Sequence, residues 1–320
     1  MSLHAARPLN ICIITQQLGQ VVSGVGLFAH HLAHRLAADG HTVCVVAPSD
    51  QRPRGELPFT FVGVPPPLLG QTQARWLTLS LNFARALAAL QSEQRFDIVH
   101  FTDARESLFS RSGAATIGNI HDTYAAEAGS PLFYRRHFAD WRVRWAYYQF
   151  VRAAECLAFP RLQALLANSE YTARAVAATY PIRHERLRVC YLGIDSEPYA
   201  RAFQLQSHGS YHPPRILFVG GNMQRKGLPS LIAAAPRVLA VQPDAEFWVV
   251  GQDKAAARMR GLCRDAGVEA NFRFWGWRSQ PELRLLYAQA DIFAMPSLTE
   301  AFGLVFLEAM AAGLPVVGTR

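Results

Sequence analysis

The chain has 320 residues, of which half are hydrophobic, and it carries 32 Lys and Arg against 24 Asp and Glu, a formal net charge of +8. This length exceeds what one hydrophobic core usually organises and indicates two domains. The composition excludes a disordered chain, a collagen and a disulfide-stapled small domain. The five cysteines form no C-x-x-C pair, which favours buried free thiols in a reducing compartment over a disulfide framework or a zinc site.

The N-terminus shows no long apolar segment followed by a small-residue cleavage site, and no window reaches about 18 uninterrupted apolar residues. The sequence therefore predicts a cytoplasmic protein, either free or peripheral at the inner membrane face. The positive charge suits a partner that carries phosphate or an anionic surface.

Short apolar runs alternate with segments of helical period through the first half of the chain. Strands are predicted at 9–15, 41–47, 59–64, 96–101, 116–120, 164–168 and 187–191, and helices at 26–39 and 72–91. This alternation is typical of a parallel sheet that helices cover.

The alternation stops at 197–214, a mixed polar segment interpreted as a linker, and then restarts. Further strands are predicted at 215–219, 245–250, 271–274, 291–295 and 315–317, and helices at 228–241, 254–266, 280–290 and 301–312. The predicted fold is α/β, with two Rossmann-like doubly wound domains at 1–196 and 215–320. Because the chain ends directly after a strand, we expect the second domain to be incomplete.

Ligands of such sheets bind outside the carboxyl ends of the strands. The turn from Gly220 to Gly227 follows the first strand of the second half and presents Arg225 beside Lys226, one of only two lysines in the chain. An Arg fork and a Lys point charge suit a diphosphate. The alternative is a solvated basic turn.

Two carboxylates follow a later strand of the same half. Glu300 lies near the start of a predicted helix and Glu308 about two turns further along, with Gly303 between them. Both side chains can face one cleft and accept hydrogen bonds from sugar hydroxyls. The alternative for Glu308 is a surface helix position, but its neighbours are apolar, and a carboxylate among them needs partners.

In the first half, Gly24 and Gly26 open a helix after the first strand, where they either let an anion approach the backbone or form a structural turn. His121 follows the strand at 116–120 and either contacts a hydroxyl or phosphate, transfers a proton, or is structural. Asn168 and Ser169 end another strand, and we expect them to cap the next helix. The acidic residue of a dinucleotide site is missing, which disfavours a nicotinamide dehydrogenase.

The segment 131–161 is rich in aromatic residues and holds six arginines with only Asp140 and Glu155 as acids. It is either a basic helix that lies on an anionic membrane or a helix pair that covers a cleft, with its arginines solvated. No nucleic-acid-binding motif is present, and no nucleic-acid partner is expected.

Taken together, these motifs resemble the GT-B retaining glycosyltransferases of family 4, also called glycosyl transferases group 1. The resemblance rests on the G-x-x-x-R-K-G turn, on the spacing of Glu300 and Glu308, on the segment 312–317, and on the order of the first-half motifs. It covers nearly the whole chain. It implies two Rossmann-like domains that face a cleft, and transfer of a hexosyl unit from a nucleotide-diphosphate sugar to a hydroxyl of a glycan or lipid-linked acceptor.

The resemblance also assigns expected roles. Arg225 and Lys226 would bind the diphosphate, Glu308 the ribose, and Glu300 the transferred sugar. His121 would lie beside that sugar on the acceptor side. The other expected donor contacts are Gly24, Gly26, Gly220, Trp275, Phe302, Gly303 and Leu304.

The resemblance implies no metal and no cofactor, with a UDP- or GDP-sugar as the donor substrate. Departing phosphate would be stabilised by the two cations. Family members usually continue beyond the segment at 312–317, so a non-catalytic nucleotide-sugar-binding remnant or fragment is one alternative. A GT-B nucleotide-sugar epimerase is the other.

Overall fold

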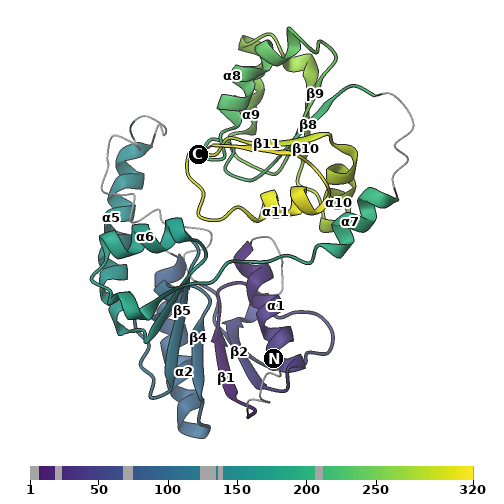
Figure 1. Ribbon diagram of the computed structural model, residues 1–320. Coiled ribbons are helices and arrows are strands. Elements are labelled where there is room, and N and C mark those ends of the chain that lie inside the picture. Colours follow the sequence, from purple (N-terminus) through teal and green to yellow (C-terminus); the bar gives the residue numbers. More distant parts are fainter. Residues whose placement is uncertain are drawn as a thin grey trace. The chain divides into compact units, whose positions relative to one another are not determined.

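The computed structural model describes residues 7–18, 24–67, 75–122, 135, 140–205 and 212–319. The chain divides into two compact units, Met1–Tyr191 and Leu192–Arg320, and Figure 1 shows that each is built on a sheet with helices. Among the described helices, none combines the length and the apolar composition needed to cross a bilayer.

The first unit contains a seven-stranded parallel sheet in the order β3-β2-β1-β4-β5-β6-β7. Its strands are β1 (Asn10–Ile14), β2 (Thr42–Pro48), β3 (Thr60–Val64), β4 (Ile98–Phe101), β5 (Ala115–Ile120), β6 (Ala164–Ala167) and β7 (Leu187–Val189). Its helices are α1 (Gly24–Ala38), α2 (Arg75–Glu93), α5 (Trp141–Ala158) and α6 (Glu170–Thr179), and short 3-10 turns include η2 (Ala104–Ser107).

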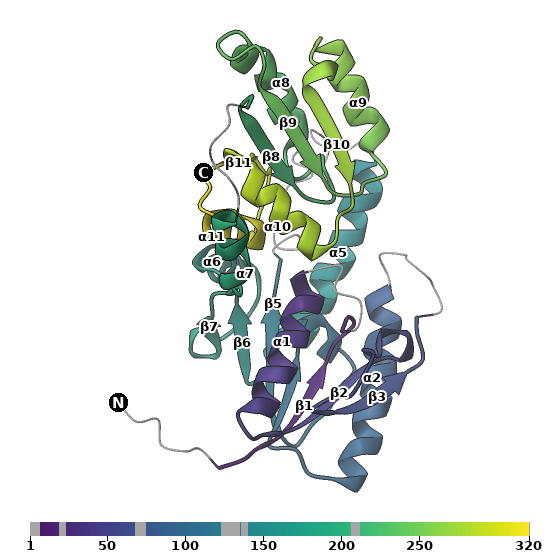
Figure 2. The same ribbon diagram turned by 90° about the vertical axis from the view of Figure 1, so that its right-hand side faces the viewer.

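The two-residue period of β1 explains why helices cover both faces of this sheet. Ile11 and Ile13 pack in one core with Ala29 of α1, whereas Cys12 and Ile14 pack in another core that includes α2 and α5. Successive side chains of a strand point to opposite faces, so α1 and α2 lie on opposite sides of the sheet, as Figure 2 also shows.

The second unit contains a five-stranded parallel sheet in the order β10-β9-β8-β11-β12. Its strands are β8 (Arg215–Val219), β9 (Glu246–Val250), β10 (Phe272–Gly276), β11 (Ile292–Met295) and β12 (Val316–Gly318). Its helices are α7 (Glu197–Gln204), α8 (Leu228–Leu239), α9 (Ala256–Asp265), α10 (Gln280–Gln289) and α11 (Leu304–Ala311).

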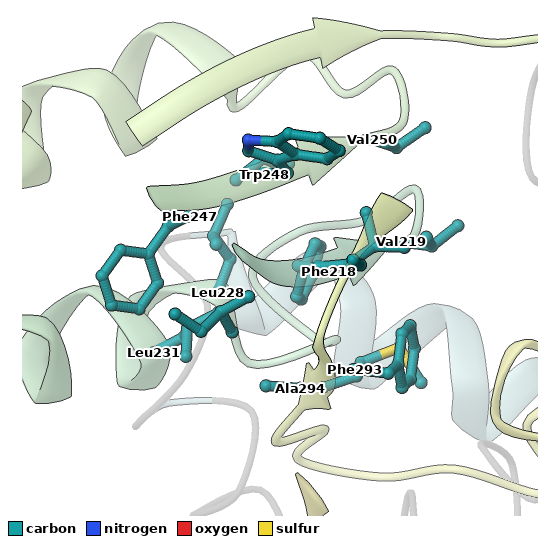
Figure 3. Packing of buried hydrophobic residues seen from close by; sticks show 14 of the residues in the cluster. Phe218, Val219, Leu228, Leu231, Phe247, Trp248, Val250, Phe293 and Ala294 are labelled. Atoms are coloured by element: carbon teal, nitrogen blue, oxygen red, sulfur yellow. The ribbon is translucent and has the colours of Figure 1, made fainter. Parts of the chain in front are cut away.

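The core of the second unit fills the space between this sheet and its helices. Figure 3 shows Phe218, Phe247 and Phe293 on three neighbouring strands, with Leu228 and Leu231 of α8 beside them. All five side chains are buried. Burial of each such side chain is worth about 2–3 kcal/mol against exposure, so this core holds the strand ends that carry the candidate site.

The α/β fold expected from the alternating pattern is confirmed, and the structure corrects two local expectations. Helix α7 occupies the first part of the segment interpreted as a linker, because Tyr199 and Phe203 lie one turn apart and pack on α10 and beside Gly313. Helix α11 begins at Leu304 rather than at 301, because Gly303 has a φ of 82° and caps the helix from the left-handed region.

Candidate functional site

Two loops meet at the carboxyl edge of the second sheet. The loop after β8 runs from Gly220 to Gly227, and the loop after β11 runs from Pro296 to Gly303. The amide of Leu298 donates to the carbonyl of Arg225 at 2.8 Å, and Nη1 of Arg225 donates to the carbonyl of Thr299 at 2.9 Å. These bonds join the two loops that carry the strongest sequence motifs.

Gly227 permits this close approach. Its φ is 79°, and a Cβ atom at this position would lie 1.7 Å from the carbonyl oxygen of Pro296. No side chain fits in that space. The requirement for glycine at this position is therefore steric, and it lets the basic turn lie against the Glu300 loop.

The Lys226 ammonium forms a close ion pair with the Glu300 carboxylate across the two loops. The side chains are 14% and 23% exposed. Burial, with the neighbouring charge of Arg225, lowers the pKa of Lys226, although the Glu300 carboxylate acts in the opposite direction. The structure thus brings three of the expected catalytic residues together, with Arg225 beside the pair.

Helix α11 begins at the same edge. Gly303 is its cap and Leu304 its first residue, and the first amides of a helix have no partner within the helix. Such amides favour an anion. Phe302, which precedes the cap, is half-buried. The backbone expected to contact the donor is therefore at the carboxyl edge with Lys226 and Glu300.

Glu308 lies in the same helix, about one turn beyond its first residue, and is 4% exposed. Its Oε2 accepts a hydrogen bond from the Tyr287 hydroxyl at 2.9 Å. The Tyr199 hydroxyl, which donates to Oε1 of Gln280 at 3.2 Å, lies close enough to affect the pKa of Glu308. Burial raises the pKa of Glu308, although both hydroxyls act in the opposite direction. A carboxylate buried among apolar neighbours needs polar partners, and the tyrosine hydroxyls supply them. Glu300 is paired with a lysine instead.

Gly220 and Trp275 lie on neighbouring parts of the same edge. A Cβ atom on Gly220 would lie 3.2 Å from Cγ of Lys226, so a side chain there would press on the lysine. Trp275 belongs to β10, with its ring edge-on to Trp248 at 5.4 Å and 5.6 Å from the Arg278 guanidinium. Its indole nitrogen is buried and has no hydrogen-bond partner among the described residues.

The first unit places His121 directly after β5. Its Nε2 donates to the carbonyl of Thr102 at 2.7 Å, and its ring lies edge-on to Phe28 with centroids 5.4 Å apart. Burial, with the positive charge of Arg105, lowers the pKa of His121, although Asp103, the Thr102 carbonyl and Asp122 act in the opposite direction. The imidazole is therefore neutral near pH 7, with its proton on Nε2.

The remaining first-half motifs lie near helix starts. Gly24 is the first residue of α1 and Gly26 is buried in its first turn, while residues 19–23, which precede them, lie outside the described part. Ser169 caps α6 by accepting from the amide of Thr172 at 3.1 Å, as expected. The Asn168 side chain instead donates to the His121 carbonyl at 3.2 Å.

Sequence reasoning missed a buried ionic cluster at the carboxyl ends of β4 and β5. Its centre is Arg105, which pairs with Asp103 and Asp122 at 2.6 and 3.0 Å and approaches Glu155 at 3.8 Å. The sequence contained a pattern that could have indicated this cluster, because Asp103 and Arg105 closely follow a predicted buried strand. The described residues hold no group of three or more His, Cys, Asp or Glu side chains that could bind a metal ion.

The two parallel α/β units, with paired cations and a carboxylate at one sheet edge, define a GT-B glycosyltransferase as the class of protein. A family model described as Glycosyltransferase Family 4 matches residues 22–198, and one described as Glycosyl transferases group 1 matches residues 213–320. The chain belongs to glycosyltransferase family 4.

Individual relatives agree with this assignment. The chain is 29% identical to the sulfoquinovosyl transferase of Arabidopsis thaliana over 76% of its own length and 46% of that protein. It is 41% identical to a GDP-mannose-dependent monoacylated phosphatidylinositol monomannoside mannosyltransferase of Corynebacterium glutamicum over 29% of its length and 26% of that protein. The chain thus spans about half or less of these curated relatives.

The fold also matches solved structures. A sucrose-phosphate synthase of Thermosynechococcus elongatus superimposes with a TM-score of 0.75 at 19% identity, over 97% of this chain and 81% of that one. At this level of identity the likeness shows the GT-B fold alone.

Proposed function

We propose that the chain transfers a hexosyl unit, with retention of configuration, from a UDP- or GDP-sugar to a hydroxyl of a glycan or lipid-linked acceptor. The observation that carries the proposal is the Lys226–Glu300 pair at the start of α11, with Arg225 bonded to the same loop. Two cations and a set of helix-start amides suit a diphosphate, and a neighbouring carboxylate suits the hydroxyls of a sugar.

In this proposal the donor diphosphate takes the place of the Glu300 carboxylate as the counter-ion of Lys226. As the bond between the sugar and the phosphate breaks, negative charge grows on the leaving diphosphate. Lys226 and Arg225 stabilise that charge most when it is largest, which lowers the barrier. Glu300, released from the lysine, accepts hydrogen bonds from the transferred sugar. The reaction needs no metal ion.

The proposal also assigns the remaining contacts. Glu308 accepts hydrogen bonds from the ribose hydroxyls, in exchange for one of its tyrosine partners. Trp275 contacts the nucleobase. His121 contacts the transferred sugar, and the helix start at Gly24 and Gly26 approaches the donor phosphate.

A direct test is incubation of the protein with UDP- or GDP-sugars labelled in the sugar. The proposal predicts release of nucleoside diphosphate with slow transfer to water or to an added acceptor, and loss of this turnover in Glu300→Ala with donor binding retained. Binding without any turnover would identify a non-catalytic nucleotide-sugar-binding protein. A new nucleotide sugar without release of diphosphate would identify an epimerase.

As a second proposal, helix α5 contacts an anionic membrane. Within the described part of 131–161, Val143, Phe150 and Leu157 recur every seven residues and are 71%, 47% and 58% exposed. Residues with this spacing share one face of a helix, and Arg142 is exposed beside them. An apolar stripe with adjacent basic charge suits the surface of an anionic membrane, where a lipid-linked acceptor is presented on the cytoplasmic side.

Sedimentation with vesicles tests this contact. Vesicles with anionic lipid should carry the wild type down, whereas the Val143→Glu, Leu157→Glu double variant should stay in the supernatant. An unchanged partition of the double variant would contradict the membrane role of this face and would favour a helix that covers the acceptor.

A further inference from the structure

The buried cluster around Arg105 lies at the two strand ends that hold His121. Arg105 belongs to η2, and its side chain is 17% exposed. Its Nε and Nη2 donate to the Asp103 carboxylate at 2.9 and 2.6 Å, and Nη2 also donates to Asp122 at 3.0 Å. Both carboxylates are largely buried, at 8% and 19% exposure.

The guanidinium bonds to the residues that follow Thr102 and His121, the two partners of the imidazole hydrogen bond. Thr102, whose carbonyl accepts from His121 Nε2, directly precedes Asp103, and His121 itself directly precedes Asp122. Because one rigid, planar group bonds to both carboxylates, it fixes the end of β4 against the end of β5. The distance between His121 and its carbonyl partner depends on that link.

The cluster also sets the charge that His121 experiences. Asp103 and Asp122 raise the pKa of His121, whereas burial and the positive charge of Arg105 lower it. Among the described residues, α1 presents the edge of Phe28 to the ring, and β4 contributes His100, whose pKa burial lowers. Without Arg105, the groups named here would leave two carboxylates acting on the imidazole without the cation that opposes them.

Protonation would change what the ring can do. With Nε2–H donated to a carbonyl, the neutral imidazole keeps a lone pair on Nδ1 and accepts a hydrogen bond there. An imidazolium has no such acceptor.

We propose that Arg105 is a positioning residue that holds His121 as the neutral Nε2–H tautomer, so that Nδ1 accepts a hydrogen bond from a hydroxyl of the sugar substrates. The inference rests on the proposed function only for the contact between His121 and substrate. The charge and tautomer of the ring are tested without any substrate.

The first experiment follows the histidine side-chain nitrogens of the full chain by nitrogen-15 NMR against pH. In the wild type, His121 should be neutral at pH 7 with the proton on Nε2. In Arg105→Met it should titrate at higher pH than in the wild type, because Asp103 and Asp122 remain. In Asp122→Asn it should titrate at lower pH, because one carboxylate is lost. The exposed Arg111→Met variant is the control and should leave His121 unchanged.

The opposite signs separate this role from simple disruption. A loosened structure would expose His121 in both variants and move both titrations upward, toward the ordinary histidine value. If Arg105→Met does not fold, two other variants give the same test. Asp122→Asn should still lower the pH at which His121 titrates, and Arg105→Lys, which keeps the positive charge, should leave His121 neutral. An upward or absent shift in Asp122→Asn would overturn the proposal.

The second experiment measures sugar transfer against pH. At pH 7, Arg105→Met should lose about tenfold or more of kcat/KM, and the loss should be smaller at pH 8.5, where less of its His121 is protonated. An equal loss at both pH values would overturn the proposed role. If the NMR shifts occur but the wild type transfers no sugar from any UDP- or GDP-sugar, the proposed function fails and the assignment of Arg105 as the residue that keeps His121 neutral stands.

Discussion

The approach of Gly227 to Pro296 gives the sharpest test of how the site is built. In Gly227→Ala the new Cβ would lie 1.7 Å from the Pro296 carbonyl oxygen, so the two loops must separate. The left-handed backbone costs a residue with a side chain about 1–2 kcal/mol, and forced separation of packed groups adds about 1–3 kcal/mol. We expect the free energy of unfolding to fall by about 2–5 kcal/mol.

Gly267 provides a matched control in the same unit. It also has a positive φ, 69°, but a Cβ atom at this position would meet nothing within 4 Å. Gly267→Ala should therefore cost only the backbone part, about 1–2 kcal/mol, and should leave nucleotide-sugar affinity unchanged. Urea unfolding monitored by tryptophan fluorescence and calorimetric titration with UDP- and GDP-sugars measure both quantities. Equal losses of stability and equal affinities in the two variants would refute the steric argument.

Two further predictions concern buried carboxyl groups. Burial raises the pKa of Glu155 to about 8 from an ordinary value of 4.5, so between these values the folded state holds a proton that the unfolded state has released. The free energy of unfolding should therefore fall as pH rises from about 5 to 8. Urea unfolding of Glu155→Gln should show a flatter pH dependence than the wild type, and an identical slope would contradict the shift. Tyr287→Phe removes a hydrogen-bond donor from the buried Glu308 carboxylate. It should lower the free energy of unfolding by about 1–3 kcal/mol and raise the pKa of Glu308 further. Unchanged urea unfolding would show that this hydrogen bond contributes nothing to stability.

The periodicity of the sequence predicted both parallel sheets because buried strands and amphipathic helices differ in repeat and length. It failed at α7, where Tyr199 and Phe203 supply a short apolar face while the polar residues that follow lower the average of the whole window. It also placed the start of α11 too early, because helical period continues through Gly303 although its backbone is left-handed.

The contacts of the candidate site could be predicted in part where its residues are adjacent in sequence. Arg225 and Lys226 share a turn, and the structure joins that turn to the Glu300 loop. The partners of Glu308 could not be predicted, since Tyr287 and Tyr199 come from two other helices. Arg105 was overlooked for a similar reason, because it bonds to Asp122, which lies 17 residues away at the end of the next strand.

Donor recognition by the basic turn is the central claim, and Lys226→Met tests it most directly. Titration with UDP- and GDP-sugars should show a loss of affinity of at least about tenfold, as expected for removal of a charged hydrogen bond worth about 1.5–3 kcal/mol. The surface variant Arg264→Met removes a cation that is 59% exposed and pairs only weakly with Glu269, and it should bind the same donor as tightly as the wild type. Equal donor affinity in the wild type and both variants would contradict the account.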